Sequence, residues 1–144
     1  MRVIVQRSGK SSVTVDNKVI GSISEGLVVL VGFTDGDNQE KIEYLAKKIV
    51  NLRIFPDDNN VMNKSILEYG GSILSISQFT LYADTKKGNR PSYIMALGGE
   101  QAYKLYQAFN EELRKYVKVE TGEFGADMIV SITNIGPTTI SMER

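Results

Sequence analysis

Hydrophobic and polar positions alternate at the start of the chain and then give way to a continuous apolar run. Residues 2–7 are rich in β-branched side chains, which favours an opening strand over a helix. Two short strands are expected at 12–15 and 18–20, joined by a tight turn at Asp16–Asn17, because Asp and Asn tolerate left-handed backbone geometry. The unbroken run from Leu27 to Phe33 is typical of a strand buried on both faces at the centre of a sheet.

Apolar residues recur at helical spacing in two later segments, so amphipathic helices are expected at about 38–52 and about 99–116. Asp37 and Glu40 have the spacing of a capping box for the first helix. Strand character returns in three further segments, at about 72–82, 127–133 and 138–142. This order predicts a mixed, mostly antiparallel and barrel-like α+β domain with two long helices, and we expect residues 1–144 to form one domain.

The charge of the chain is balanced, with 17 basic and 17 acidic residues among 144. This balance argues against a strongly basic, indiscriminate nucleic-acid binder, but it leaves specific recognition of one RNA end open. The N-terminal segment is too short and too polar for a secretory signal. The longest apolar run falls far short of the roughly 20 residues that cross a bilayer. A soluble, cytoplasmic protein without a membrane partner is therefore expected.

The chain contains neither histidine nor cysteine, which removes most of the usual catalytic and metal chemistry. Zinc sites draw mainly on these two residues, and hydroxyl nucleophiles usually rely on a histidine base. The sequence also lacks Ser-x-x-Lys, Gly-x-Ser-x-Gly and the glycine-rich phosphate loops of nucleotide enzymes. We therefore expect neither a metal nor a cofactor. Backbone dipoles, hydroxyls, carboxylates and groups of the substrate remain available for catalysis.

The segment Ser77-Gln78-Phe79-Thr80-Leu81 offers two hydroxyls, an amide and an aromatic ring, enough to bind a polar substrate and stack a ring. Strand alternation would place Ser77, Phe79 and Leu81 on one face and the other two on the opposite face. The simpler interpretation is a half-buried strand with no further function.

The segment Asn134-Ile135-Gly136-Pro137 reads most simply as a turn between the last two strands. Glycine before proline permits unusual backbone angles, and X-Pro is the common site of cis peptide bonds. A cis bond would need a functional reason, such as two carbonyls that must point the same way.

The loop around Lys86, Lys87 and Arg90 contains three cations beside a glycine and a proline, which is a suitable binding site for the phosphates of a nucleic-acid backbone. A solvated charged loop is the plainer interpretation. Groups of carboxylates such as Asp35 and Asp37 do not follow the EF-hand register, so we interpret them as caps and turns.

Taken together, these pieces resemble the D-aminoacyl-tRNA deacylase family, homodimeric editing enzymes that remove D-amino acids from tRNA. The resemblance covers essentially the whole chain, and its strength lies in an ordered set of motifs. Besides the two motifs above, these are Val5-Gln6-Arg7, Arg53-Ile54-Phe55, Met62-Asn63, Gly70-Gly71-Ser72, Ala83-Asp84-Thr85, Gly88-Asn89-Arg90-Pro91-Ser92 and Gly122-Glu123-Phe124-Gly125-Ala126-Asp127-Met128.

The resemblance implies that Gly136-Pro137 is a cis dipeptide inserted into the pocket of the partner subunit, where its carbonyls receive the α-amino group of the substrate. Arg7 would help to hold this dipeptide. An L side chain would be driven against the rigid backbone, so the enzyme would select D-amino acids by excluding L-amino acids from the pocket. The pocket around the aminoacyl-adenosine end would be lined by six residues: Ser77, Gln78, Phe79, Thr80, Ala96 and Met128.

The resemblance also implies how the ester would be cleaved. An activated ester needs a positioned water and stabilisation of an oxyanion, which the backbone N–H groups of Phe79 and Thr80 would provide. In the family, the ribose 2′-OH of the terminal adenosine assists. Thr80 as a covalent nucleophile is the competing idea, and the sequence supplies no base for it. Glycine mischarged on alanine tRNA should also be accepted.

Two positions depart from the common family pattern. Thr138 stands where Val is usual, and Tyr93 stands where Phe is frequent. Thr138 follows the Gly136-Pro137 dipeptide, so this difference concerns how strictly L-aminoacyl-tRNA is rejected. The expected partners are the 3′ end of tRNA and a second copy of the chain, without DNA. The alternative function is a non-catalytic nucleic-acid-binding protein on the same fold.

Overall fold

The computed structural model describes all 144 residues, which form ten strands, three α-helices and one 3-10 helix. The strands are β1 (Arg2–Ser8), β2 (Ser11–Val15), β3 (Lys18–Ile23), β4 (Gly26–Gly32), β5 (Phe55–Pro56), β6 (Met62–Lys64), β7 (Ser72–Ser77), β8 (Val119–Thr121), β9 (Ile129–Ser131) and β10 (Asn134–Glu143). The helices are α1 (Gln39–Val50), α2 (Ile66–Tyr69), the 3-10 helix η1 (Phe79–Tyr82) and α3 (Gly99–Arg114). None of the helices has the length and apolar character needed to span a membrane.

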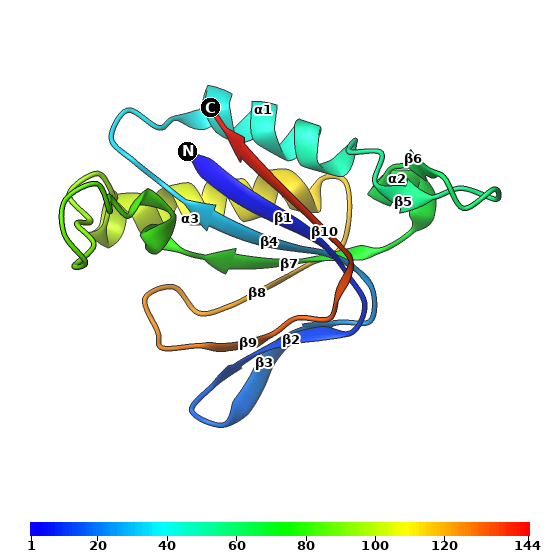
Figure 1. Cartoon of the computed structure of the whole chain (residues 1–144), viewed down its shortest axis with the longest axis horizontal. Helices are drawn as coiled ribbons and strands as arrows, with labels where there is room; N and C mark the ends of the chain where they lie inside the picture. The colour runs from blue at the N-terminus through cyan, green and yellow to red at the C-terminus, as the bar shows by residue number, and fades with distance from the viewer.

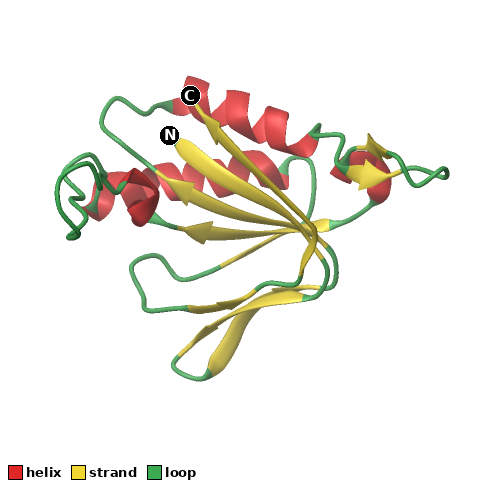
Figure 2. Cartoon of the chain, in the orientation of Figure 1, coloured by secondary structure: helices red, strands yellow, loops and turns green.

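A five-stranded sheet in the order β10-β1-β4-β7-β8 forms the centre of the molecule (Figure 1). β1 pairs antiparallel with both β10 and β4, whereas β4, β7 and β8 run parallel to one another. The helices α1 and α3 lie together against one face of this sheet, and the small sheet β3-β2-β9 lies on the other side (Figure 2). The predicted α+β class is confirmed, and the sheets do not close into a barrel.

The position of β4 follows from its composition. Leu27, Val29 and Val31 pack against the helices, while Val28 packs with residues of the small sheet, so both faces of the strand are buried. Such a strand has no polar face to offer to water and must lie inside the sheet. The expectation of a central strand from the apolar run is confirmed by its pairing with β1 and β7.

Most of the predicted elements are present, with small shifts at their ends. The opening strand, the hairpin with both turn residues at positive φ (47° and 62°), and both long helices are found where they were expected. The predicted capping box of Asp37 and Glu40 is wrong, because Asn38 is the N-cap of α1 and its side chain accepts from the Lys41 N–H. The small elements β5, β6 and α2 were not predicted, since segments of two to four residues carry no measurable periodicity.

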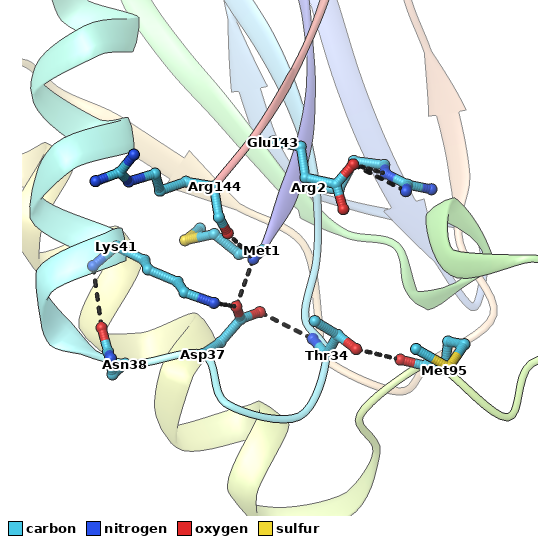
Figure 3. Close-up of polar contacts among 9 residues, drawn as sticks. All are labelled: Met1, Arg2, Thr34, Asp37, Asn38, Lys41, Met95, Glu143 and Arg144. Atoms are coloured by element: carbon cyan, nitrogen blue, oxygen red, sulfur yellow. Dashed lines mark hydrogen bonds and ion pairs between the residues drawn. The ribbon is translucent and has the colours of Figure 1, made fainter.

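Asp37 instead forms a buried polar cluster (Figure 3). Its fully buried carboxylate accepts from the Met1 amino group, from the Thr34 N–H at 2.8 Å and from the Lys41 Nζ at 3.0 Å. The Met1 amino group also donates to the Arg144 carbonyl at 2.7 Å. Burial lowers the pKa of this amino group, while the Asp37 carboxylate acts in the opposite direction. The cluster joins both ends of the chain to the loop between β4 and α1.

We expect Asp37→Asn to lower the free energy of unfolding by about 3–5 kcal/mol, because breaking a buried pair leaves an uncompensated charge. Denaturant unfolding measures this change. Asp35→Asn is the matched control, since Asp35 is exposed two residues away, and it should change stability by less than about 0.5 kcal/mol. Equal stability of the two variants would contradict a structural role for the cluster.

Candidate functional site

A cavity of about 610 Å³ opens at the C-terminal ends of β4 and β7. Its lining comes from these two strand ends, the start of η1, the segment before α3, the first turn of α3 and the loop between β8 and β9. In Figure 1 both strands point toward the loop at the left of the view, which connects η1 to α3. Backbone from distant parts of the sequence therefore converges at this edge of the sheet.

The floor of the cavity depends on a close approach between β4 and the residue that follows β7. The Gln78 N–H donates to the Val31 carbonyl at 2.7 Å. A Cβ atom at Gly32 would lie 2.8 Å from the Gln78 carbonyl oxygen, which is closer than side-chain carbons approach backbone. Only glycine permits this contact, so Gly32 lets the strand end reach the turn that carries the motif.

Aromatic side chains form part of the cavity wall. Phe79 is 54% exposed and meets Tyr93 edge to face, with 5.1 Å between the ring centroids. Phe124 lines another part and contacts Tyr103 and Tyr106. These rings can bury the flat, apolar parts of a ligand, and the exposed Phe79 ring is available for stacking.

The polar groups of the cavity are few. Ser77 and Gln78 line it, and Asp127 is the one charged residue of the lining. α3 begins at the cavity with Gly98 as its N-cap, and no side chain caps its first N–H groups. The cavity thus combines hydroxyl, amide and backbone groups with a single carboxylate.

Two phenols near the site, Tyr106 and Tyr82, have a raised pKa. Burial raises the pKa of Tyr106, whose hydroxyl donates to the Ser75 carbonyl at 2.8 Å and ties α3 to β7. Burial raises the pKa of Tyr82, at the end of η1, to about 12. In the whole chain, no three carboxylate side chains lie close enough to hold a metal ion.

Five of the predicted site residues are brought together in the cavity: Ser77, Gln78, Phe79, Ala96 and Met128. Thr80 does not line it, and its hydroxyl accepts from the Gln78 side-chain amide instead. The strand alternation expected for 77–81 is wrong, because the strand ends at Ser77 and the chain continues as the 3-10 helix η1. Phe79 and Thr80 therefore begin a helix, where the first N–H groups have no intrahelical acceptor.

The second motif also differs from its simplest interpretation. Asn134-Ile135-Gly136-Pro137 is the start of β10 rather than a turn, and the Gly136–Pro137 bond is cis. Both residues are exposed. The Pro137 carbonyl accepts from the Thr139 hydroxyl at 3.2 Å, which itself accepts from the Asn134 side chain at 3.0 Å.

Arg7 lies beside this dipeptide within the same chain. A Cβ built on Gly136, whose φ is +115°, would meet Arg7 Nη2 at 3.1 Å and Thr138 Oγ1 at 2.6 Å. Arg7 Nη1 donates to the Ile54 carbonyl at 2.8 Å, which fixes the guanidinium. Glycine is required here by both the backbone conformation and the lack of space.

The dipeptide and the cavity lie at opposite ends of the sheet. Arg7 pairs with Leu27 at the start of β4, whereas the cavity begins at Val31, which pairs with Val3. Four residues of strand separate the two positions, or about 13 Å at 3.3 Å per residue. The two motifs of one chain therefore do not meet in one site.

The three predicted phosphate contacts, Lys86, Lys87 and Arg90, are exposed and form no ion pair. Their loop is closed by paired backbone hydrogen bonds between Asp84 and Ser92, 2.8 and 2.9 Å long, and leads directly into Tyr93 at the cavity. These three residues do not line the cavity, but they lie in the same connection between η1 and α3 as Tyr93, which does line it.

Sequence reasoning missed several lining residues, among them Phe33, Leu97, Gly98, Gly99, Ala102 and Val130. The paired glycines before the second helix were a usable signal, because a helix start without a capping side chain leaves its N–H groups open. The apolar residues carried no signal that distinguishes a cavity wall from a core.

Comparison with known proteins places this chain in a class of tRNA deacylases. Residues 4–143 match the family described as D-Tyr-tRNA(Tyr) deacylase. A D-aminoacyl-tRNA deacylase of Clostridium botulinum (strain Langeland) is 58% identical over 144 residues, covering 99% of this chain and 97% of the relative. One of Clostridium novyi (strain NT) is 55% identical over the same coverage.

Two solved structures are also similar. One, titled c-Myc DNA Unwinding Element Binding Protein, has a TM-score of 0.94 and 40% identity and covers 100% of this chain and 99% of its own. The other, titled as a probable eukaryotic D-amino acid tRNA deacylase, has a TM-score of 0.83 and 19% identity and covers 98% of this chain and 97% of its own. The chain belongs to the D-Tyr-tRNA(Tyr) deacylase family.

Proposed function

We propose that this protein is an aminoacyl-tRNA editing enzyme that hydrolyses the ester of D-aminoacyl-tRNA to a free D-amino acid and tRNA. Membership of the deacylase family over nearly the whole chain makes it an ester hydrolase of this kind. The observation that carries the proposal is the cavity formed by Ser77, Gln78 and Phe79. Its aromatic rim and sparse polar groups suit an aminoacyl-adenosine end. We propose that the enzyme acts in the cytoplasm, because tRNA is charged there.

Selection against L-aminoacyl-tRNA is proposed to come from Gly136-Pro137. Both residues are exposed, so their carbonyls would accept the α-amino group of the substrate, and an L side chain would be driven against the backbone of the dipeptide. The hydrogen bond from Thr139 and the neighbouring Arg7 support this backbone. Because the filter acts on the backbone part of the substrate, different D side chains and glycine, including glycine mischarged on alanine tRNA, should be accepted.

A homodimer with shared sites is proposed for a geometric reason. The filter and the cavity of one chain lie at opposite ends of the sheet, so a complete site needs the dipeptide of a second chain. β10, which carries the dipeptide, is a ten-residue edge strand, and long open edges are usually covered in native proteins. Ile129 and Ile135, 67% and 45% exposed, add apolar surface nearby.

The proposed chemistry relies on the backbone. The N–H groups of Phe79 and Thr80, at the start of η1, can stabilise the oxyanion that forms when water attacks the ester. No histidine or thiol is available, and burial raises the pKa of both Tyr106 and Tyr82. The ribose 2′-OH of the terminal adenosine assists the attack, and Lys86, Lys87 and Arg90 contact the tRNA backbone.

A second candidate is a non-catalytic nucleic-acid-binding protein on the same fold. The observation that favours it is the 40% identical structure titled as a DNA-element-binding protein, together with the three unpaired cations of the loop. Binding of phosphates needs neither the cavity nor Gly136-Pro137, whereas chiral hydrolysis needs both.

Release of amino acid from matched D-tyrosyl-, L-tyrosyl- and glycyl-tRNA tests the function. Purified protein without added metal should release D-tyrosine fast, glycine measurably and L-tyrosine slowly. Release of L-tyrosine as fast as D-tyrosine would contradict the chiral filter. No release above background, with tRNA still bound, would favour the second candidate.

Thr80→Ala should keep substantial activity, because the oxyanion is held by backbone N–H groups and the Thr80 hydroxyl is turned toward Gln78. Single-turnover hydrolysis of D-tyrosyl-tRNA measures this. A loss of more than about a thousandfold with an intact fold, or a trapped acyl-Thr80, would identify Thr80 as the nucleophile.

Mixing two variants that each lack chirally selective hydrolysis tests the shared site. Pro137→Ala damages the filter, and Ala96→Trp fills the cavity, so each homodimer should lose chirally selective activity. After unfolding and refolding together, heterodimers contain one intact site, and random pairing should restore about a quarter of the wild-type selective activity. Activity that stays absent in the mixture, although heterodimers form, would show that each chain builds its own site.

A further inference from the structure

One wall of the cavity is an irregular segment rather than a strand or helix. This pocket wall, residues 93–98, contributes Tyr93, Ala96, Leu97 and Gly98 to the lining. It belongs to the long connection between η1 and α3, where regular structure is absent except for the single bridge between Asp84 and Ser92. Its position must therefore come from individual hydrogen bonds and packing.

The outward residues of the pocket wall cannot hold it by packing. Ile94 is 87% exposed and Met95 is 58% exposed, so both side chains project largely into solvent. Leu97 packs against the core, and two hydrogen bonds connect the wall to the residues that follow β4. The Leu97 N–H donates to the Phe33 carbonyl at 2.8 Å, and the Thr34 hydroxyl donates to the Met95 carbonyl at 2.6 Å. The second is the one side-chain hydrogen bond between the pocket wall and the rest of the fold.

Thr34 is itself held by the buried cluster around Asp37. The Thr34 N–H donates to Asp37 Oδ2 at 2.8 Å, while Asp37 Oδ1 accepts from Met1 and Lys41 (Figure 3). The figure shows the hydroxyl of Thr34 turned toward Met95 and its backbone turned toward Asp37. A rigid, fully buried carboxylate thus orients the residue that binds the pocket wall.

We propose that Thr34 is a positioning residue that holds the pocket wall at the spacing required for binding the aminoacyl-adenosine end, through its hydrogen bond to the Met95 carbonyl. This inference rests on the proposed function of the cavity. Thr34 does not line the cavity, and it belongs to a different segment from η1, which carries the N–H groups assigned to the oxyanion. Loosening the wall therefore weakens binding of the substrate and of the transition state alike, which raises KM and leaves kcat unchanged.

The test compares Thr34→Val, which keeps the shape of the side chain but removes the donor, with Thr34→Ser, which keeps the donor. For D-tyrosyl-tRNA, Thr34→Val should raise KM about three- to tenfold, the usual effect of one neutral hydrogen bond, with kcat within about twofold of wild type. Thr34→Ser should restore KM. Thr14→Val is the matched control, because the Thr14 side chain is half-buried in β2 and outside the cavity lining.

Hydrogen exchange at the Leu97 amide gives a second readout that a general loss of stability would not produce. In Thr34→Val this amide should exchange faster, while the denaturant midpoint stays near that of wild type. An unchanged KM, a loss of kcat with an unchanged KM, or a failure of serine to rescue would overturn the proposal. Absence of hydrolysis by the wild type would instead contradict the proposed function, and Leu97 exchange alone would then decide whether Thr34 holds the wall.

Discussion

β1 is hydrogen-bonded to β4 on one side and to β10 on the other, and this double pairing determines where the functional segments lie. Arg2 lies beside Gly32 and Glu143, and Ser8 lies beside Gly26 and Asn134. One end of the three strands therefore carries the cavity, while the other carries Arg7 and Gly136-Pro137. A slip of register by one residue would turn Val3 and Val5 out of the core, so the separation of the two ends is as well determined as the core itself.

The composition of the cavity limits the chemistry that it can perform. Its lining holds a single formal charge, Asp127, and otherwise hydroxyl, amide, aromatic and backbone groups. Backbone N–H groups do not titrate, and they are already oriented before the substrate arrives, so they can stabilise developing charge without reorganisation. This is the kind of help that the proposed cleavage of an activated ester requires. The absence of histidine from the sequence and the arrangement of the cavity are consistent with one another on this point.

The sequence predicted the elements well where a long pattern repeats and poorly where a contact between distant residues decides the local structure. The apolar run of β4 and the helical spacing of α1 and α3 reflect burial, which is visible as periodicity. The segment from Ser77 to Leu81 was predicted to be a strand because polar and apolar residues alternate along it. The strand ends at Ser77 because Gln78 turns onto the end of β4, where Gly32 leaves room for its carbonyl. Neither segment alone contains that information.

The residues of the site were also predicted only in part. The motif resemblance identified Ser77, Gln78, Phe79, Ala96 and Met128, which do line the cavity, but it could not reveal that Thr80 turns away toward Gln78. The sequence around Asp37 suggests a helix cap, whereas its buried carboxylate accepts from the Met1 amino group, which also donates to the Arg144 carbonyl at the other end of the chain.

The proposed assembly has a consequence that follows from symmetry. If a dipeptide at one end of the sheet enters a cavity at the other end of a second chain, a two-fold axis makes the same contact occur twice. Each chain then supplies one filter and one cavity, and neither site exists without the other subunit. The rigid β1 pairing holds the two contributions of a chain at a constant separation. A shift of the subunits that improved one site would therefore move the other by the same amount, so both sites must be satisfied by one docking geometry.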